Sequence, residues 1–161
     1  MDFASRLLQC NDAYVGNAVL EAIRRLFERD FELLQMGIKE ETIAHHLAHY
    51  LDPYFPDFRA DVEYSLMGDI PKRVTYEENP QLVYPDIIVH MRNKIANGIP
   101  NKDANVLAIE MKKDTNTEAS ARDIVKLRAY RRELDYRHAL FVRFGTRDAA
   151  GTICECEWVD A

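Results

Sequence analysis

Residues 106–113 read Val-Leu-Ala-Ile-Glu-Met-Lys-Lys, an aliphatic run that passes directly into charged residues. The continuous apolar part predicts a buried strand. Because side chains alternate between the two faces of a strand, Glu110 and Lys112 are predicted to share one face. A carboxylate on an otherwise buried strand costs several kcal/mol unless it is paired or bound to a metal. This stretch therefore predicts a central strand that carries chemically active groups at its end.

The preceding apolar segment, Leu82–Met91, predicts a neighbouring central strand that carries Asp86. Pro85 has no backbone donor, so its position should be a bulge or the start of the strand. The polar segment Arg92–Asn105 should join the two strands as a long-looped hairpin. Two acidic groups and a lysine that meet at neighbouring strands are most simply explained by a divalent cation.

The residue types suit Mg²⁺ or Mn²⁺. Mg²⁺ takes oxygen ligands at about 2.0–2.1 Å and keeps several waters, so one or two carboxylates and a backbone carbonyl are enough. Asp86, Glu110 and the main-chain oxygen of Met111 could supply that set. Lys112 would then position the attacking water and offset the charge that develops on the phosphate. The pattern predicts metal-dependent hydrolysis of phosphodiester bonds.

Two motifs extend this reasoning to a known family. Residues 84–90 (Tyr-Pro-Asp-Ile-Ile-Val-His), followed by residues 107–113, resemble the PD-(D/E)xK nuclease superfamily, which includes restriction endonucleases and many phage-defence and repair enzymes. The resemblance implies that Asp86 is the motif aspartate, Glu110 the second acidic residue and Lys112 the catalytic lysine. It also implies a nucleic-acid substrate, with DNA favoured over RNA.

The family also carries an acidic residue on a helix before the sheet. Glu40 is the candidate, because it precedes Ile43 and Leu47 by three and seven residues and so lies on the inward stripe of its helix. Glu63 is a further candidate for orienting the attacking water. A glutamate that faces solvent from a strand would look the same in sequence.

The resemblance implies a restriction-endonuclease-like, three-layer α/β fold with a central mixed sheet of four or five strands flanked by helices. In this single domain, the core covers about residues 38–144, after a helical extension over 1–37 and before a closing strand within 145–161. Apolar periodicity predicts helices over 11–36, 39–51 and 118–134, and further strands over 61–66, 139–144 and 153–158. Gly37 and Thr117 are the expected C-terminal and N-terminal caps of the first and last helices.

A net charge of −6 argues against a protein whose whole surface binds nucleic acid, although local basic patches remain compatible with it. Three residues are predicted to contact a phosphate backbone: Lys113, Arg122 and Lys126. Tyr130 or Tyr136 could stack on a base. A charged helix face that is simply solvated is the alternative. Asp123 lies near the apolar stripe of the last helix, which predicts an ion pair with Lys112.

Other potentially reactive residues have plain structural explanations. His45 and His49 show the one-turn spacing of zinc-binding helices, but the glutamate of that motif is missing, so side chains facing solvent are expected. His90 is expected to be buried and hydrogen-bonded, with an auxiliary role beside Asp86 as the alternative. The cysteines lack paired spacing, and reduced thiols are expected: Cys10, Cys154 and Cys156.

No stretch approaches the roughly 20 apolar residues that span a bilayer, and the first ten residues lack a leader pattern. We therefore expect a cytoplasmic protein with no membrane partner. A glycine-rich phosphate loop and a serine-hydrolase elbow are also missing from the sequence, which leaves nucleotide-triphosphate and serine-hydrolase chemistry unsupported.

A non-catalytic nucleic-acid- or protein-binding module that retains the nuclease fold is the alternative function. The intact set of Asp86, Glu110 and Lys112 argues against it, because an unneeded buried charge is costly. Cleavage of both DNA strands by a single-site domain would favour a homodimer, with the helix over Asn11–Met36 as the expected surface. The sequence leaves open whether the substrate is DNA or RNA, whether it is single- or double-stranded, whether cleavage is sequence-specific, and whether cleavage is internal or from an end.

Overall fold

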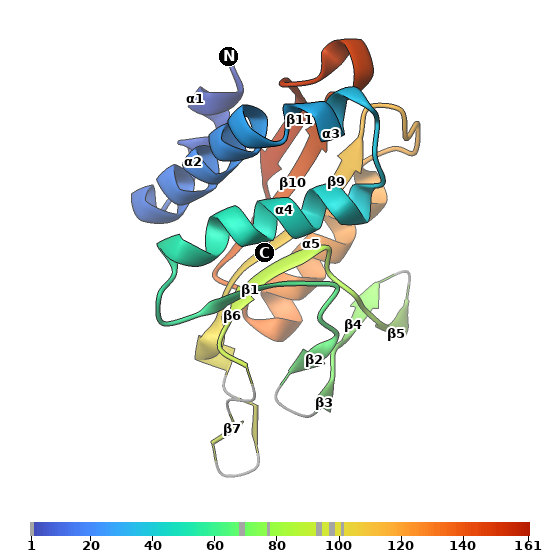
Figure 1. Cartoon of the computed structure of the whole chain (residues 1–161). Coiled ribbons are helices and arrows are strands. Elements are labelled where there is room, and N and C mark those ends of the chain that lie inside the picture. Colours follow the sequence, from blue (N-terminus) through green and yellow to red (C-terminus); the bar gives the residue numbers. More distant parts are fainter. Residues whose placement is uncertain (1, 68–69, 77, 93–94, 97–98, 101) are drawn as a thin grey trace.

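Five strands form a mixed sheet at the centre of the molecule (Figure 1). The computed structural model describes residues 2–67, 70–76, 78–92, 95–96, 99–100 and 102–161. In spatial order the strands are β1 (Arg59–Val62), β6 (Ile87–His90), β9 (Asn105–Lys113), β10 (His138–Phe144) and β11 (Ile153–Trp158). β9 and β10 are parallel and the other neighbours are antiparallel. The prediction of a mixed sheet within an α/β fold is confirmed.

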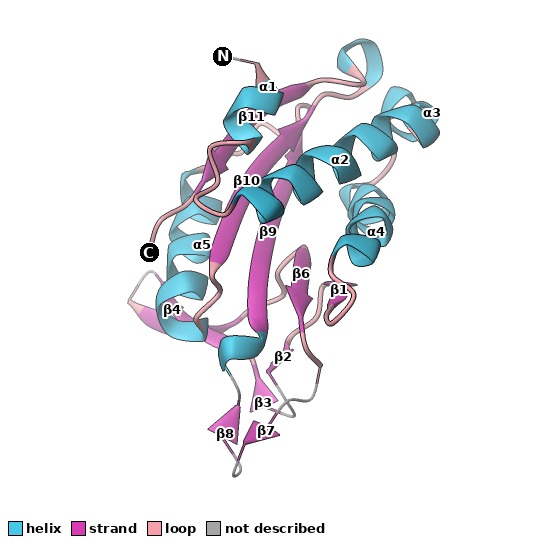
Figure 2. Ribbon diagram, turned by 90° about the vertical axis from the view of Figure 1, so that its left-hand side faces the viewer, coloured by secondary structure: helices cyan, strands magenta, loops and turns pink. Residues whose placement is uncertain are grey.

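Helices cover both faces of the sheet, and Figure 2 shows α2 and α4 on one side and α5 on the other. The first face carries α1 (Phe3–Leu7), α2 (Ala13–Arg29), α3 (Phe31–Gln35) and α4 (Glu40–Leu51). The second face carries α5 (Ala121–Leu134), which is the crossover that two parallel neighbours such as β9 and β10 require. Within the described ranges, the helices are too short or too polar to cross a membrane.

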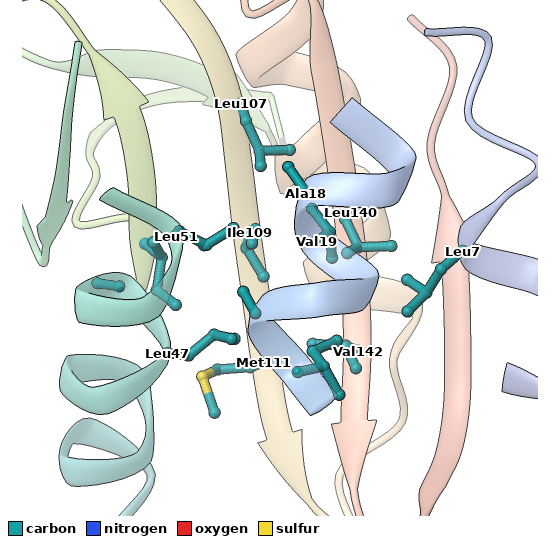
Figure 3. Packing of buried hydrophobic residues seen from close by; sticks show 14 of the residues in the cluster. Leu7, Ala18, Val19, Leu47, Leu51, Leu107, Ile109, Met111, Leu140 and Val142 are labelled. Carbon is teal, nitrogen blue, oxygen red and sulfur yellow. The ribbon is translucent and has the colours of Figure 1, made fainter. Parts of the chain in front are cut away.

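Two hydrophobic cores lie on the two faces of the sheet. Figure 3 shows Ile109 and Met111 of β9 on the side of α2 and α4, near Val19 and Leu47. Ala108 belongs to the cluster on the opposite face, which includes the apolar side of α5. Both faces of β9 are therefore buried. This explains why its sequence is continuously apolar rather than alternating.

Short elements connect the main strands. Between β1 and β6 the chain forms β2 (Leu66–Met67), β3 (Ile70–Pro71), β4 (Arg73–Tyr76) and β5 (Asn79–Leu82), and after β6 it forms β7 (Ile95–Ala96) and β8 (Ile99–Pro100). Single 3₁₀ turns occur at Asp52–Tyr54, Lys102–Ala104 and Arg147–Ala149. β6 and β9 are antiparallel neighbours, as the predicted hairpin requires, although residues 93–94, 97–98 and 101 of the connecting loop lie outside the described part. β4 packs against α5, on the same face of the sheet as Ala108.

The first long helix is interrupted, so the prediction of one helix over 11–36 is wrong. α2 ends at Arg29 and α3 begins at Phe31. Asp30, between them, leaves the helical conformation with φ −125° and ψ 27°. Its carboxylate accepts a hydrogen bond of 2.6 Å from the hydroxyl group of Tyr50 on α4. At the end of this region Gly37 adopts φ +66°, which confirms the predicted left-handed cap.

The N-terminal helices pack into the same core as the rest of the domain. On α2 the buried apolar side chains are Val15, Ala18, Val19, Leu20, Ala22, Ile23 and Leu26. The apolar face of this helix therefore packs on its own sheet, and a homodimer through the helix stays a prediction.

The first strand is shorter than the sequence predicts. β1 ends at Val62 because Glu63 adopts φ +49°, a left-handed conformation that an extended strand does not continue. Tyr64 therefore lies outside β1, and the chain enters the separate strand β2 at Leu66. The predicted alternation over 61–66 fails at a single backbone position.

Two other boundaries also move. The segment expected as one strand over Leu82–Met91 supplies the last residue of β5, and β6 begins at Ile87. Pro85 thus lies just before a strand start, one of the two positions predicted for it. α5 begins later than expected, with Ser120 rather than Thr117 as its N-cap.

Removing one buried side chain of α2 should test whether this helix is part of the folding unit. Ile23→Ala is expected to lower the free energy of unfolding by about 2–5 kcal/mol, because the side chain is completely buried and its removal leaves a cavity. Urea denaturation monitored by circular dichroism would measure the change. The control, Leu8→Ala, removes a side chain that is 47% exposed and should have a much smaller effect. Equal midpoints for the wild type and Ile23→Ala would contradict the described packing.

Candidate active site

Two acidic side chains from neighbouring strands meet at one end of the sheet. Asp86 lies directly before β6, and Glu110 lies in β9. The Asp86 carboxylate accepts a hydrogen bond of 2.7 Å from the backbone N–H of Met111. Its carboxyl group also interacts with that of Glu110. The structure therefore brings together the two acidic residues that the sequence pattern selected.

Burial dominates the electrostatics of this pair. Glu110 is 3% exposed. Burial, followed by the charge of Asp86, raises the pKa of Glu110 to about 8. Burial also raises the pKa of Asp86 to about 6, although the N–H of Met111 acts in the opposite direction. Both pKa values are therefore shifted in the same direction, because ionisation of one carboxyl group opposes ionisation of the other.

The backbone of Met111 presents its polar groups toward Asp86. In a strand, the N–H and C=O of one residue point to the same side, and the N–H of Met111 donates to Asp86. The carbonyl oxygen of Met111 therefore also points toward the start of β6, where Asp86 lies. This is the direction that the predicted third oxygen ligand requires.

Lys112 lies on the α5 side of the sheet, the face that also carries Glu110. Its ammonium nitrogen is 3.1 Å from Asp123 Oδ2 and 3.2 Å from Glu118 Oε2. The predicted ion pair between Lys112 and Asp123 is confirmed. Burial alone would lower the pKa of Lys112, but these carboxylates outweigh it and the pKa is raised, so the lysine is cationic.

Two residues of α5, rather than Lys112, contact Glu110. The ammonium group of Lys126 lies 3.2 Å from Glu110 Oε2, and the hydroxyl of Tyr130 donates to Glu110 Oε1 at 2.8 Å. Lys126 also pairs with Asp123 at 3.3 Å. The sequence pattern predicted a phosphate contact for Lys126 and did not indicate that Lys126 or Tyr130 contacts Glu110. The spacing of Asp123, Lys126 and Tyr130, three and four residues apart on one helix face, was the available signal.

Neither tyrosine proposed for base stacking is accessible. Tyr130 and Tyr136 are each 1% exposed, so their rings belong to the core on the α5 side of the sheet. The stacking role predicted for them is wrong. An amphipathic pattern places a tyrosine on the inner face of a helix, and there its ring packs while its hydroxyl group seeks a partner.

The other two acidic candidates have different positions. Glu40 accepts a hydrogen bond of 3.3 Å from the side chain of Asn116. Its charge contributes to the raised pKa of Asp86, so Glu40 lies near the candidate site. The side chain of Glu63 is exposed and lines a shallow groove with Glu41 and neighbouring residues. Its backbone N–H, at 3.2 Å from the carbonyl oxygen of Asp86, is the group that faces the site.

A cleft of about 500 Å³ adjoins the acidic pair through Lys126, which lines the cleft and contacts Glu110, whereas Asp86 and Glu110 do not line it themselves. Its lining includes Lys112, Glu118, Arg122, Lys126 and Tyr76 of β4. The guanidinium group of Arg122 lies 5.8 Å from the centre of the Tyr76 ring. Two of the three residues predicted to contact phosphate therefore line this cleft.

Lys113, the third predicted phosphate contact, is placed elsewhere. Strand alternation sends its side chain to the opposite face of the sheet from Lys112. There its ammonium group donates to the carbonyl oxygen of Gly37 at 3.1 Å.

The oxygen donors fit a hard divalent cation. Among the described residues, no three His, Cys, Asp or Glu side chains are grouped to hold a metal ion. Mg²⁺ does not need such a cage, because one or two carboxylates with waters and substrate phosphate are enough. The interacting pair Asp86 and Glu110 meets that need, and Lys126 already holds a positive charge against Glu110.

The remaining reactive residues are explained by structure. His90 is 3% exposed, and its Nε2 lies 2.8 Å from Asp61 Oδ2, which confirms a buried, hydrogen-bonded histidine. His45 and His49 are exposed on α4. The three cysteines are free thiols, as expected, with Cys154 exposed and the other two buried.

Comparisons with known proteins leave the family open. No family model and no curated protein matches the chain. A solved structure described as "Crystal structure of SSO0001" aligns with a TM-score of 0.43 and 14% identity, over 89% of this chain. The chain spans 65% of the length of that protein.

Proposed function

We propose that this protein is a Mg²⁺- or Mn²⁺-dependent nuclease that hydrolyses phosphodiester bonds, with DNA as its expected substrate and a restriction-endonuclease-like fold. The contact between Asp86 and Glu110 carries the proposal, because the half-buried carboxyl group of Asp86, directly before β6, interacts with the buried carboxyl group of Glu110 on the adjacent strand β9. A divalent cation would relieve the repulsion between them more completely than the single positive charge of Lys126.

Each neighbour of the pair has a defined task in this proposal. When bound, the cation would polarise the scissile phosphate and make a nearby water a stronger nucleophile. Asp86 and Glu110 would supply the negative charge that binds the cation, and the N–H of Met111 orients the Asp86 carboxylate. Tyr130 fixes the orientation of Glu110 through its hydroxyl hydrogen bond.

Two lysines supply the positive charge that phosphodiester cleavage needs. Lys112 lines the cleft and is fixed by Asp123 and Glu118, so its ammonium group is preorganised to face charge developing on the phosphate. Lys126 bridges Glu110 and Asp123 and connects the metal carboxylates to the cleft. The non-catalytic binding module is the rival, and it gives no reason for this arrangement of lysines around a buried acidic pair.

The test is cleavage of labelled DNA and RNA, single- and double-stranded, with Mg²⁺ or Mn²⁺. Wild type should cut at least one of these substrates and lose activity in EDTA. Lys112→Ala should cut about a hundredfold to a thousandfold more slowly, the usual effect of removing one group that stabilises developing charge. The matched control, Lys39→Ala, removes an exposed lysine outside the cleft and should retain wild-type activity. Intact substrates in every reaction, from a protein that still binds Mn²⁺, would favour the binding module.

A further inference from the structure

The position and shape of the candidate site bear on which form of nucleic acid can reach it. Glu110 is almost fully buried, so the scissile phosphate must enter below the protein surface. The adjoining cleft, at about 500 Å³, has the size of a small-ligand pocket. One or two nucleotides fit that volume. A double helix, which is stiff over about 150 base pairs, cannot bend a single phosphate group into it without a large distortion.

Charge around the site supports the same conclusion. Duplex binding normally draws its affinity from many Lys and Arg contacts to phosphates. This chain has a net charge of −6, and both lysines that line the cleft are already paired with Glu110, Glu118 or Asp123. These groups can make only a short contact with the phosphate backbone of a nucleic acid. Most of the binding affinity must therefore come from another source.

Aromatic rings provide that source. Tyr84 is 54% exposed and lies two residues before Asp86, so their Cα atoms are at most about 7 Å apart. Tyr76 lines the cleft beside Arg122, and it is an electrostatic neighbour of Tyr130, the residue that holds Glu110. Rings of this kind stack on unpaired bases of any sequence, whereas the bases of a duplex are already stacked on each other.

We propose that the site binds a single, unpaired strand of DNA or RNA, with Tyr84 and Tyr76 as stacking surfaces for its bases. This inference rests on the proposed nuclease function for the identity of the site. It replaces the buried Tyr130 and Tyr136 with two rings that solvent can reach.

Fluorescence anisotropy in EDTA would test binding without cleavage. The probes are a short labelled DNA oligonucleotide, the RNA of the same sequence, and the DNA duplex. We expect at least one single strand to bind ten times more tightly than the duplex, and Tyr84→Ala to weaken that binding about tenfold. Tyr84→Phe keeps the ring and should bind as the wild type does. The control Tyr14→Ala removes a similarly exposed ring, 59% accessible, from α2 and should leave affinity unchanged.

Equal or tighter binding of the duplex, or unchanged affinity in Tyr84→Ala, would overturn the inference. Hydrolysis of bis(p-nitrophenyl) phosphate with Mn²⁺ separates this result from the proposed function, because that phosphodiester has no bases to stack. Hydrolysis together with duplex preference would leave a nuclease and reject the single strand. Absence of Mn²⁺-dependent hydrolysis, together with tight, Tyr84-dependent binding of a single strand, would reject the nuclease and support the binding inference.

Discussion

Asp86→Asn is expected to abolish Mn²⁺ binding and to reduce metal-dependent cleavage about a thousandfold or more. The substitution keeps the shape of the side chain, and its amide oxygen can still accept the hydrogen bond from Met111. It removes the negative charge that would hold the cation, and a loss of several kcal/mol in the transition state corresponds to this factor. Titration calorimetry with Mn²⁺ and a cleavage assay on the best substrate would measure the two effects.

Stability distinguishes this loss from simple misfolding. Because Asp86 is a poorly solvated acidic group whose pKa is raised to about 6, the neutral variant should unfold at the same temperature as the wild type or slightly higher at neutral pH. The control is Asp30→Asn, which alters a carboxylate bound to Tyr50 at the junction of α2 and α3, away from the site. This variant should lose stability and keep Mn²⁺ binding. Mn²⁺-dependent cleavage by Asp86→Asn at the wild-type rate would refute the assigned role.

The central strands were predictable because their burial leaves a signature in a single stretch of chain. β9 is buried on both faces, so its residues from Val106 to Ile109 are all apolar, and the change to charge at Glu110 marks where the strand reaches the site. Strand alternation then gives the relation between Glu110 and Lys112 without reference to other elements. Pro85 likewise marks the start of β6 through the donor that it lacks.

Features that depend on tertiary contacts were not predictable in the same way. Periodicity continues through Asp30, and the break becomes understandable once Tyr50 of α4 is seen to donate to its carboxylate. Glu63 departs from the extended conformation at one residue, and glutamate carries no signal for a positive φ. In both places the local sequence is compatible with the wrong continuation.

In the candidate site, too, features fixed within one strand were predictable, and features that depend on tertiary contacts were not. Asp86 and Glu110 follow from motifs within their own strands, whereas the contacts of Lys126 and Tyr130 with Glu110 exist because α5 packs across β9. Helical spacing shows that Lys126 and Tyr130 share a face, but it does not say which face meets the sheet at the level of Glu110. The exposure of the tyrosines also depends on tertiary packing, because Tyr130 is buried in the core and Tyr84 is exposed to solvent.

Glu110→Gln is expected to remove the pH dependence of stability that this residue imposes on the metal-free protein. Its pKa rises from 4.5 to about 8 on folding, through burial and then through the charge of Asp86. A raised carboxyl pKa means that its stabilising contribution is complete below about pH 4.5 and is lost as the pH rises through about 8. The wild type should therefore lose stability across this window, by an amount of the order of a few kcal/mol.

Glutamine at position 110 cannot ionise, and its amide can still face Lys126 and Tyr130. Urea denaturation in EDTA should give nearly equal stability for variant and wild type near pH 5, and a more stable variant near pH 9. The control Glu157→Gln changes an exposed glutamate on β11 and should keep the wild-type profile. Mn²⁺ should stabilise the wild type above about pH 8, because ligands that bind the folded state shift its equilibrium, and should leave Glu110→Gln unchanged. Parallel pH profiles for the wild type and Glu110→Gln would show that Glu110 is not the buried partner of Asp86 on which the metal site depends.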